Sequence, residues 1–284
     1  MPGKFEVLQR MTTALRPLST GELLDRTFAL YRSHFALFLG IFALPHLVVL
    51  AFQCLGVAFE PAGTQLTNIL ARLPWIYGAI LLSWLLGAVS QAATVMAVSQ
   101  VHLDHATSVV DSYSRVKKHL LGVIGLSFIV GLAAGACLIL IVPGILLFVM
   151  WSLAVQAKVL EDKGVFESMT RSSDLTRGRR WRIFVILALF FILAIVVSQL
   201  LQWPINLAAG VSGNIALQRV APVWQVASLA ATFVSECLVG PLGTIALSLI
   251  YYDERVRKEA FDLQLMMMTL DAQPLAASSA QVQA

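Results

Sequence analysis

Two ionisable side chains lie inside long apolar runs, where an ionised group would be costly in a bilayer. Glu236 lies in the run from residue 223 to 251, and His46 lies in the run from 35 to 59. An acid near the middle of a membrane span usually has a functional role. At 1.5 Å per residue, Glu236 would lie about 22 Å and His46 about 16 Å from the same membrane edge. We therefore take both as candidates for a polar cavity that handles a proton, a cation or a lipid headgroup.

A structural role explains the same acid equally well. A protonated Glu236 would hydrogen-bond across helices with Gln53, Gln91 or Gln199. Such a bond contributes about 1 kcal/mol to helix packing. The sequence leaves both explanations open.

Metal-capable side chains gather between the second and third apolar runs: His102, Asp104 and His105, with Asp111 and His119 nearby. His102 and His105 share a helix face at three-residue spacing, but a metal site needs three or four converging ligands. Histidines at a membrane interface are far commoner than such sites. We therefore predict no metal and no cofactor.

Catalytic motifs are absent from the sequence. It contains no GxSxG nucleophile elbow, no GxxxxGK[ST] phosphate loop and no HExxH zinc motif. Cys54, Cys137 and Cys237 lie in separate apolar runs without CxxC spacing, which predicts small buried hydrophobes. We expect a protein without enzymatic activity.

The composition requires a lipid environment. Of the 284 residues, 58% are hydrophobic and only 13% are charged. Too little polar surface exists to cover a folded domain of this length, so the apolar excess must face lipid. The net charge of +4 does not indicate nucleic acid as a partner, because the positions of the basic residues have another explanation.

Six apolar segments approach or exceed the roughly 20 residues that a helix needs to cross a bilayer. The third and fourth are separated only by Val142, Pro143 and Gly144, which favours a tight hairpin because proline cannot continue the preceding helix. The sequence predicts an all-α membrane domain over residues 19–270, with spans at 35–59, 74–101, 120–141, 145–160, 183–203 and 223–251.

The basic residues orient these spans. Eighteen of the twenty Lys and Arg residues fall on one side of the six-span arrangement, and only Arg72 and Arg219 fall on the other. Short cytoplasmic segments retain positive charge. Both termini are therefore predicted in the cytoplasm, with residues 1–18 as an N-terminal segment and 271–284 as a disordered tail.

A short amphipathic stretch precedes the first, third and fifth spans, which predicts three units of helix plus transmembrane hairpin. In the first stretch, Ser19 and Glu22 have capping-box spacing. The apolar stripes are Leu24, Phe28, Tyr31 and Phe35, then Val109, Tyr113, Val116 and Leu120, then Val165, Phe166, Met169 and Leu175. Such helices either lie in the lipid headgroup region or dock on the cytoplasmic face of the bundle.

Three stretches together resemble a known family: LSTGELLDRTFALYRSHFALFLGIFALP (18–45), VPGILLFVMWSLAVQAKVLEDKGVFESMTRSSDLTRGRRWRIF (142–184) and LIYYDERVRKEAFDLQL (249–265). They are similar to the glycerophosphoryl diester phosphodiesterase membrane domain family of bacterial multi-span proteins. The resemblance implies a bacterial inner-membrane protein. In that family a catalytic domain sometimes follows the membrane domain. None follows here, so we expect a stand-alone membrane domain.

Together these features predict a non-enzymatic membrane protein that binds or organises membrane lipids or a partner protein. The residues proposed to contact lipid headgroups are Arg177, Arg179, Arg180 and Arg182. The alternative is a small transporter or channel that uses Glu236. Spans interrupted by proline favour this alternative, but the absence of a clear inverted repeat weighs against it. The oligomeric state is left open.

Overall fold

The computed structural model describes residues 18–59, 65–102, 105, 107–137, 142–211 and 222–259. Every regular element within these residues is an α-helix, as predicted. Six segments are long and apolar enough to cross a membrane, which also agrees with the prediction. They are Phe35–Ala58, Leu70–His102, Leu120–Cys137, Val142–Glu161, Arg180–Gly210 and Pro222–Lys258.

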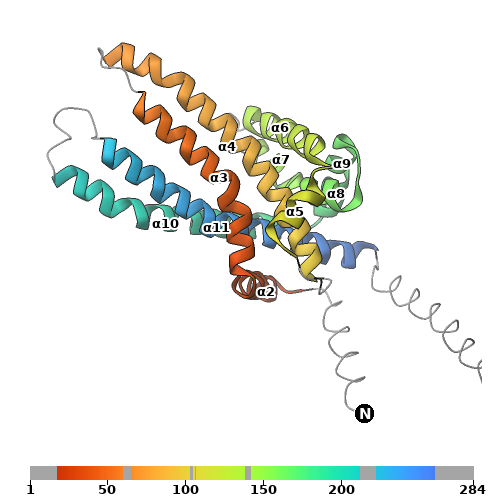
Figure 1. Ribbon diagram of the computed structural model, residues 1–284. Coiled ribbons are helices and arrows are strands. Elements are labelled where there is room, and N and C mark those ends of the chain that lie inside the picture. Colours follow the sequence, from red (N-terminus) through yellow and green to blue (C-terminus); the bar gives the residue numbers. More distant parts are fainter. Residues whose placement is uncertain are drawn as a thin grey trace, which may run out of the picture.

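The helices, some long and some short, form a bundle (Figure 1). Apart from Leu18, the predicted N-terminal segment and the predicted tail 271–284 lie outside the described residues. In chain order the helices are α2 (Thr20–Ser33), α3 (Phe35–Ala58), α4 (Gln65–His102), α5 (Val109–Val116), α6 (Leu120–Cys137), α7 (Val142–Met150), α8 (Ala154–Glu161), α9 (Val165–Thr176), α10 (Arg180–Val211) and α11 (Pro222–Glu259).

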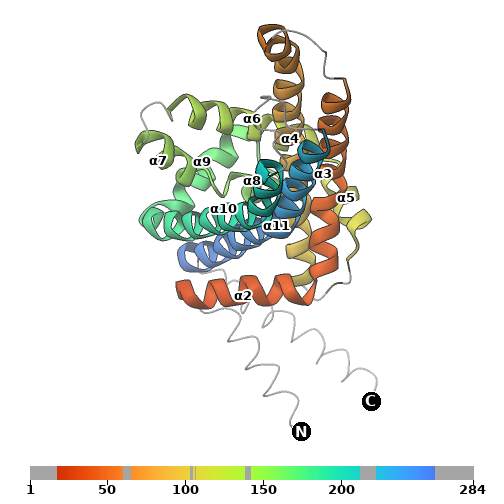
Figure 2. The ribbon, with the colours of Figure 1, turned by 90° about the vertical axis from the view of Figure 1, so that its left-hand side faces the viewer.

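The last long helix, α11, is the centre of the bundle. It packs against α2, α3, α4, α8, α9 and α10, and Figures 1 and 2 show it running between the α3–α4 pair and α10. Its most apolar window is 67% buried, against 17% for α10. Gly240 permits the close approach to α3, because a Cβ there would lie 2.4 Å from the Phe42 ring.

The outward faces of the long helices carry large apolar side chains. On α10, Phe191 is 68% exposed and Leu200 is 73% exposed. Comparable side chains on α3 and α4 include Leu44, Leu47 and Ile80. Exposure of such a continuous apolar surface to water would be unfavourable in free energy, whereas lipid chains would cover it.

The predicted fourth span, 145–160, is not one helix. It divides into α7 and α8, with turns at residues 151–153 between them. Ser172 of α9 supplies hydrogen-bond partners at this break: its Oγ donates to the Met150 carbonyl at 2.8 Å and accepts from the Leu153 N–H at 3.1 Å. The break is therefore stabilised by a side chain that comes from another helix.

Other helix ends also differ from the predicted spans. The helices α4, α10 and α11 all extend beyond the predicted 74–101, 183–203 and 223–251. Backbone hydrogen bonding does not stop where the apolar run stops, so polar residues continue these helices. The predicted third span, 120–141, ends at Cys137 in α6, and residues 138–141 lie outside the described part of the chain.

The predicted capping box at the start of α2 is confirmed. The Ser19 Oγ accepts from the Glu22 N–H at 3.2 Å, and the Glu22 carboxylate accepts from the Ser19 N–H at 2.8 Å. On α2, Leu23 and Thr27 are fully buried, and Leu24 and Tyr31 of the predicted stripe pack beside them, whereas Phe28 remains 45% exposed. The buried face therefore overlaps the predicted stripe only in part.

The helices α5 and α9 also contact the bundle with one face. On α5, Val116 is buried, and the Tyr113 hydroxyl donates to the Ile41 carbonyl of α3. Burial raises the pKa of Tyr113 to about 12, so this phenol remains a proton donor at neutral pH. On α9, Met169 is buried, but Phe166 is 72% exposed. Part of each predicted stripe thus packs inward and part faces outward.

Candidate functional site

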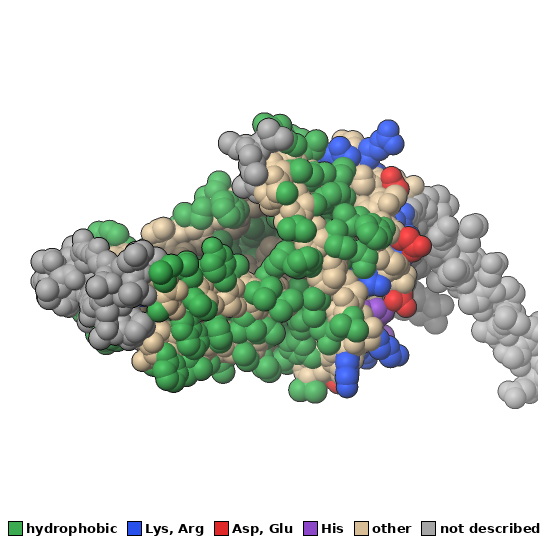
Figure 3. Space-filling model, turned by 90° about the horizontal axis from the view of Figure 1, so that it is seen from above, with side chains coloured by type: hydrophobic (Ala, Val, Ile, Leu, Met, Phe, Trp, Pro, Cys, Tyr) green, Lys and Arg blue, Asp and Glu red, His purple; other side chains and the backbone are tan. Residues whose placement is uncertain are grey.

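Charged side chains gather at one end of the molecule, which we call the basic end (Figure 3). The basic end consists of α2, α5, α9, residues 179–182 and residues 251–258. Over the rest of the face seen in Figure 3, apolar side chains dominate the described surface. Chemistry that needs charge is therefore concentrated at this end.

The Asp253 carboxylate is the most connected group of the basic end. Its side chain is fully buried. It accepts hydrogen bonds from the Leu18 backbone N–H at 2.8 Å, from Arg182 Nη1 at 2.6 Å and from Arg257 Nε at 3.1 Å. Because a buried charge is costly unless it is paired and hydrogen-bonded, these donors are what allow a carboxylate at this position.

The two arginines complete a network that we call the Asp253 cluster (Leu18, Arg179, Arg182, Asp253, Glu254 and Arg257). Arg182 and Arg257 both donate to the Leu18 carbonyl, at 2.9 and 2.6 Å. The Glu254 carboxylate lies 3.6 Å from Arg182 and 3.7 Å from Arg179. Its side chain is fully buried, and neither oxygen has a hydrogen-bond partner among the described residues.

A second ionic group joins α8, α9 and α11. Glu161, at the end of α8, pairs with Lys163 at 2.6 Å and with Arg171 of α9 at 3.0 Å. The Tyr251 hydroxyl of α11 donates to the same carboxylate, and Arg255 lies 3.9 Å from it. The Glu161 side chain is 11% exposed. These contacts attach α9 to the end of α8 and to α11.

The four arginines predicted to contact lipid headgroups divide into two pairs. Arg182 is held in the Asp253 cluster, and Arg179 lies beside Glu254. The other two, Arg177 and Arg180, line an open pocket of about 530 Å³ between α9 and α10. Arg179 and Arg182 therefore have acidic partners inside the protein, whereas Arg177 and Arg180 remain available to a ligand.

The pocket around Arg177 and Arg180 is built on a turn. Gly178, with φ +86°, adopts the left-handed conformation between α9 and α10. Lys258 of α11 donates to the Arg177 carbonyl at 2.9 Å and so brings a third cation to the turn. The rest of the lining is Ser173, Asp174 and Trp181. We call this site the Arg177–Arg180 pocket.

Charge and burial in the Arg177–Arg180 pocket suit an anion. Two arginines and one acid, Asp174, line the pocket, and the Lys258 ammonium donates to the Asp174 and Arg177 backbone carbonyls beside it. The Arg180 Nε is buried and has no hydrogen-bond partner in the described part of the chain. Trp181 is 75% exposed beside it, where an indole would lie at headgroup level in a membrane.

Glu236 and His46, which the sequence places at similar depth, lie beside each other. The His46 Nε2 is 3.8 Å from the Glu236 carboxylate. The His46 Nδ1 donates to the Phe42 carbonyl at 2.8 Å, which turns Nε2 toward the acid. Both line a pocket of about 550 Å³, with Gln199, Ser198 and others. Gln53 and Gln91, the other predicted partners of the acid, line different pockets.

The histidine and cysteine groups do not form a metal centre within the described residues, where no set of three His, Cys, Asp or Glu side chains converges. His102 stacks on Tyr252, and His119 lies 3.0 Å from Asp162. Asp104 lies outside the described residues. Of the cysteines, Cys237 is buried as predicted, whereas Cys54 and Cys137 are half-buried.

The sequence interpretation missed the acids that organise the basic end. Asp253, Glu254 and Glu161 were not singled out, although YYDERVRKE places acids and bases close together directly after an apolar span. Carboxylates that directly follow an apolar span are expected to form ion pairs with the arginines on the same side of the membrane. That pattern was the signal from which the Asp253 cluster could have been predicted.

Comparison with known proteins gives one partial match. Residues 128–254 are similar to a family described as a domain of unknown function (DUF7847). No curated protein and no solved structure matches the chain. The matched segment runs from α6 to Glu254, so it contains both Glu161 and Asp253 but neither α2 nor α3.

We predict that Asp253→Asn strongly destabilises the protein. The amide would remove the buried carboxylate that accepts from both Arg182 and Arg257, and removal of one partner of a buried ion pair costs about 3–5 kcal/mol. Thermal unfolding in detergent measures the effect. Asp25→Asn on the exposed face of α2 is the matched control, with an expected change below about 0.5 kcal/mol. Equal melting temperatures for the two variants would contradict a structural role for the Asp253 cluster.

Proposed function

We propose that the chain is a polytopic membrane protein of the bacterial inner membrane, with six transmembrane helices and both termini in the cytoplasm. The separation of the basic end from the apolar side chains that dominate the rest of the face in Figure 3 supports this topology. In this arrangement α2, α5 and α9 are cytoplasmic helices that precede three hairpins. Their exposed apolar residues Phe28, Val110 and Phe166 would enter the headgroup region, while their other faces hold the bundle.

We also propose a relationship to the membrane domain family of glycerophosphoryl diester phosphodiesterases. The three stretches that carry the resemblance meet in the Asp253 cluster: the first supplies Leu18, the second Arg182 and the third Asp253. A shared structural core of this kind would explain why these stretches resemble the family together. It implies no phosphodiesterase activity, and we propose a non-enzymatic role.

We propose that the molecular function is the binding of anionic phospholipid at the cytoplasmic face. The observation that carries this proposal is the Arg177–Arg180 pocket, an open cationic pocket beside the exposed Trp181. Arg guanidinium groups form paired hydrogen bonds with phosphate. The position at the α9–α10 turn, where α10 leaves the charged end for the apolar part of the bundle, suits a lipid headgroup.

The double substitution Arg177→Gln and Arg180→Gln should weaken the binding of phosphatidylglycerol. Each basic residue contributes about 1 kcal/mol near a membrane surface, so the loss of both predicts an affinity lower by about 30-fold. Native mass spectrometry of delipidated protein titrated with phosphatidylglycerol measures it, with phosphatidylcholine as the comparison lipid.

The control for this experiment removes the same charge elsewhere. Lys117→Gln with Lys118→Gln changes two exposed lysines that follow α5 at the same end of the molecule. We expect this pair to retain nearly the wild-type affinity. An equal loss in both double variants would indicate attraction by net charge alone and would contradict a defined site.

Transport is the second candidate function, because Glu236 and His46 face each other in a pocket. The Glu236 side chain is 49% exposed, so the acid faces the open pocket and not a dry core. A carboxylate beside an imidazole in a low-dielectric region is an arrangement that binds and releases a proton or a cation. A purely structural pair would instead hold α3 against α11.

Glu236→Gln separates these roles. If the pair carries a proton or a cation, proteoliposomes with the variant should lose the proton or cation flux that wild-type protein supports, because the amide cannot change its charge. A pH-sensitive dye in the vesicle lumen reports the flux. Empty vesicles and the Gln91→Ala variant, which changes a different pocket, are the controls. Wild-type vesicles that are no more permeable than empty ones would contradict the transport candidate.

A further inference from the structure

A further open pocket lies at the far end of the bundle from the basic end. It lies between the α3–α4 pair and the beginning of α11 and has a volume of about 640 Å³. Figure 1 shows the α3–α4 pair and the α10–α11 pair separating toward this end. On the proposed topology, this pocket opens in the outer half of the membrane. We call it the outer groove.

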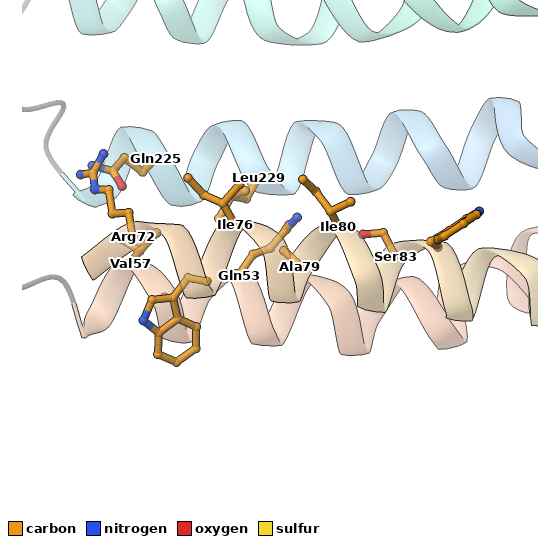
Figure 4. Close-up of a pocket in the computed structure, with 12 residues that line it drawn as sticks. Gln53, Val57, Arg72, Ile76, Ala79, Ile80, Ser83, Gln225 and Leu229 are labelled. Carbon is orange, nitrogen blue, oxygen red and sulfur yellow. The ribbon is translucent and has the colours of Figure 1, made fainter. Parts of the chain in front are cut away.

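One cation marks the end of the outer groove. Arg72 of α4 lies there beside Gln225 of α11 (Figure 4). It is one of only two basic residues that the charge pattern assigns to the outer side. Arg72 lies at the open end of this pocket, and a guanidinium carries five N–H donors. An anionic ligand at this end would complement its charge.

The wall of the outer groove becomes apolar below Arg72. Ile76, Ile80 and Leu229 follow along α4 and α11, and Figure 4 shows these side chains lying between the two helices. Gln53 of α3 lies at mid-depth with its amide directed into the space. Trp75 and Trp84 complete the lining. An amphiphile with a charged end and an apolar chain matches this order of side chains.

The length of the outer groove fits a single leaflet. From Arg72 to Ser83 the helix rises by about 17 Å at 1.5 Å per residue. The hydrocarbon core of a bilayer is about 30 Å thick, so the outer groove spans little more than half of it. An acyl chain from one leaflet has this reach, whereas a helix of a second copy would cross both leaflets.

A neighbouring pocket gives the headgroup more room. It has a volume of about 590 Å³ and shares Val57, Arg72, Gln225 and Leu229 with the outer groove. Arg72 therefore lies at the junction of two cavities, and Trp224 and Asn206 line the second. A phosphate at Arg72 would have space on both sides for the remainder of a lipid headgroup.

We propose that the outer groove binds one phospholipid of the outer leaflet, with its phosphate at Arg72 and one acyl chain along Ile76 and Ile80. The guanidinium pairs with the phosphate, and the two tryptophans contact the chain. This site lies on the opposite membrane face from the Arg177–Arg180 pocket and goes beyond the function proposed there. This proposal depends on the proposed topology only for the assignment of the bound lipid to the outer leaflet.

The test removes the inner site first, so that the two sites are measured separately. In protein that already carries Arg177→Gln and Arg180→Gln, native mass spectrometry with dioleoyl phosphatidylglycerol should still show one tightly bound lipid. Adding Arg72→Gln should lower its affinity by about tenfold or more, because a charged hydrogen-bonded pair is lost. Adding Ile80→Trp should have a similar effect, because the larger side chain fills the outer groove.

A matched substitution controls for general damage. Ile192 of α10 is 57% exposed, close to the 58% of Ile80, but it lies outside the outer groove. Ile192→Trp should leave the affinity unchanged. If Arg72→Gln and Ile80→Trp both bind the lipid with wild-type affinity, the proposal is wrong. It is also wrong if the wild-type protein is a dimer and Ile80→Trp becomes a monomer that still binds the lipid, because a second copy would then occupy the outer groove. If the Arg177–Arg180 pocket proves not to bind lipid, these results at the outer groove are unaffected, because that pocket is already removed in the protein used here.

Discussion

The fold depends on the burial of one carboxylate. Asp253 lies on the central helix, and its partners Leu18 and Arg182 come from positions 235 and 71 residues away in the sequence. Because an unpaired carboxylate cannot remain buried at acceptable cost, the start of α2 and the start of α10 are held against the end of α11. The bundle is thereby fixed at the basic end, and α3–α4 and α10–α11 are free to separate at the other. Both proposed lipid sites follow from this arrangement.

The same ionic constraint decides which arginines are available to a ligand. Four arginines within six residues would look equivalent on a helical wheel, yet Arg182 is occupied by Asp253 and Arg179 lies beside Glu254. Arg177 and Arg180 are left at the pocket because Gly178 turns the chain away from α9. Because Arg179 and Arg182 pair with acids inside the protein, the positive charge left for a ligand is confined to the Arg177–Arg180 pocket.

The sequence predicted the elements better than their junctions. The six apolar segments, the helical class and the Ser19–Glu22 capping box depend on local composition and spacing, and the structure confirms them. The break between α7 and α8 depends on Ser172, a residue 19 positions beyond Leu153, and no local pattern indicates that contact. Partner choice in the Asp253 cluster is equally non-local. The sequence identified Arg182 as a cation but could not indicate its carboxylate.

Topology is the claim on which the functional proposals rest, and site-directed labelling tests it most directly. In protein whose native cysteines are replaced, a cysteine introduced at the exposed Thr170 of α9 should react with a membrane-impermeant maleimide only after the cytoplasmic side is opened. A cysteine introduced at Arg72 should react in intact cells. Labelling of position 170 in intact cells would contradict the account, because it would place the Arg177–Arg180 pocket and the Asp253 cluster outside the cell.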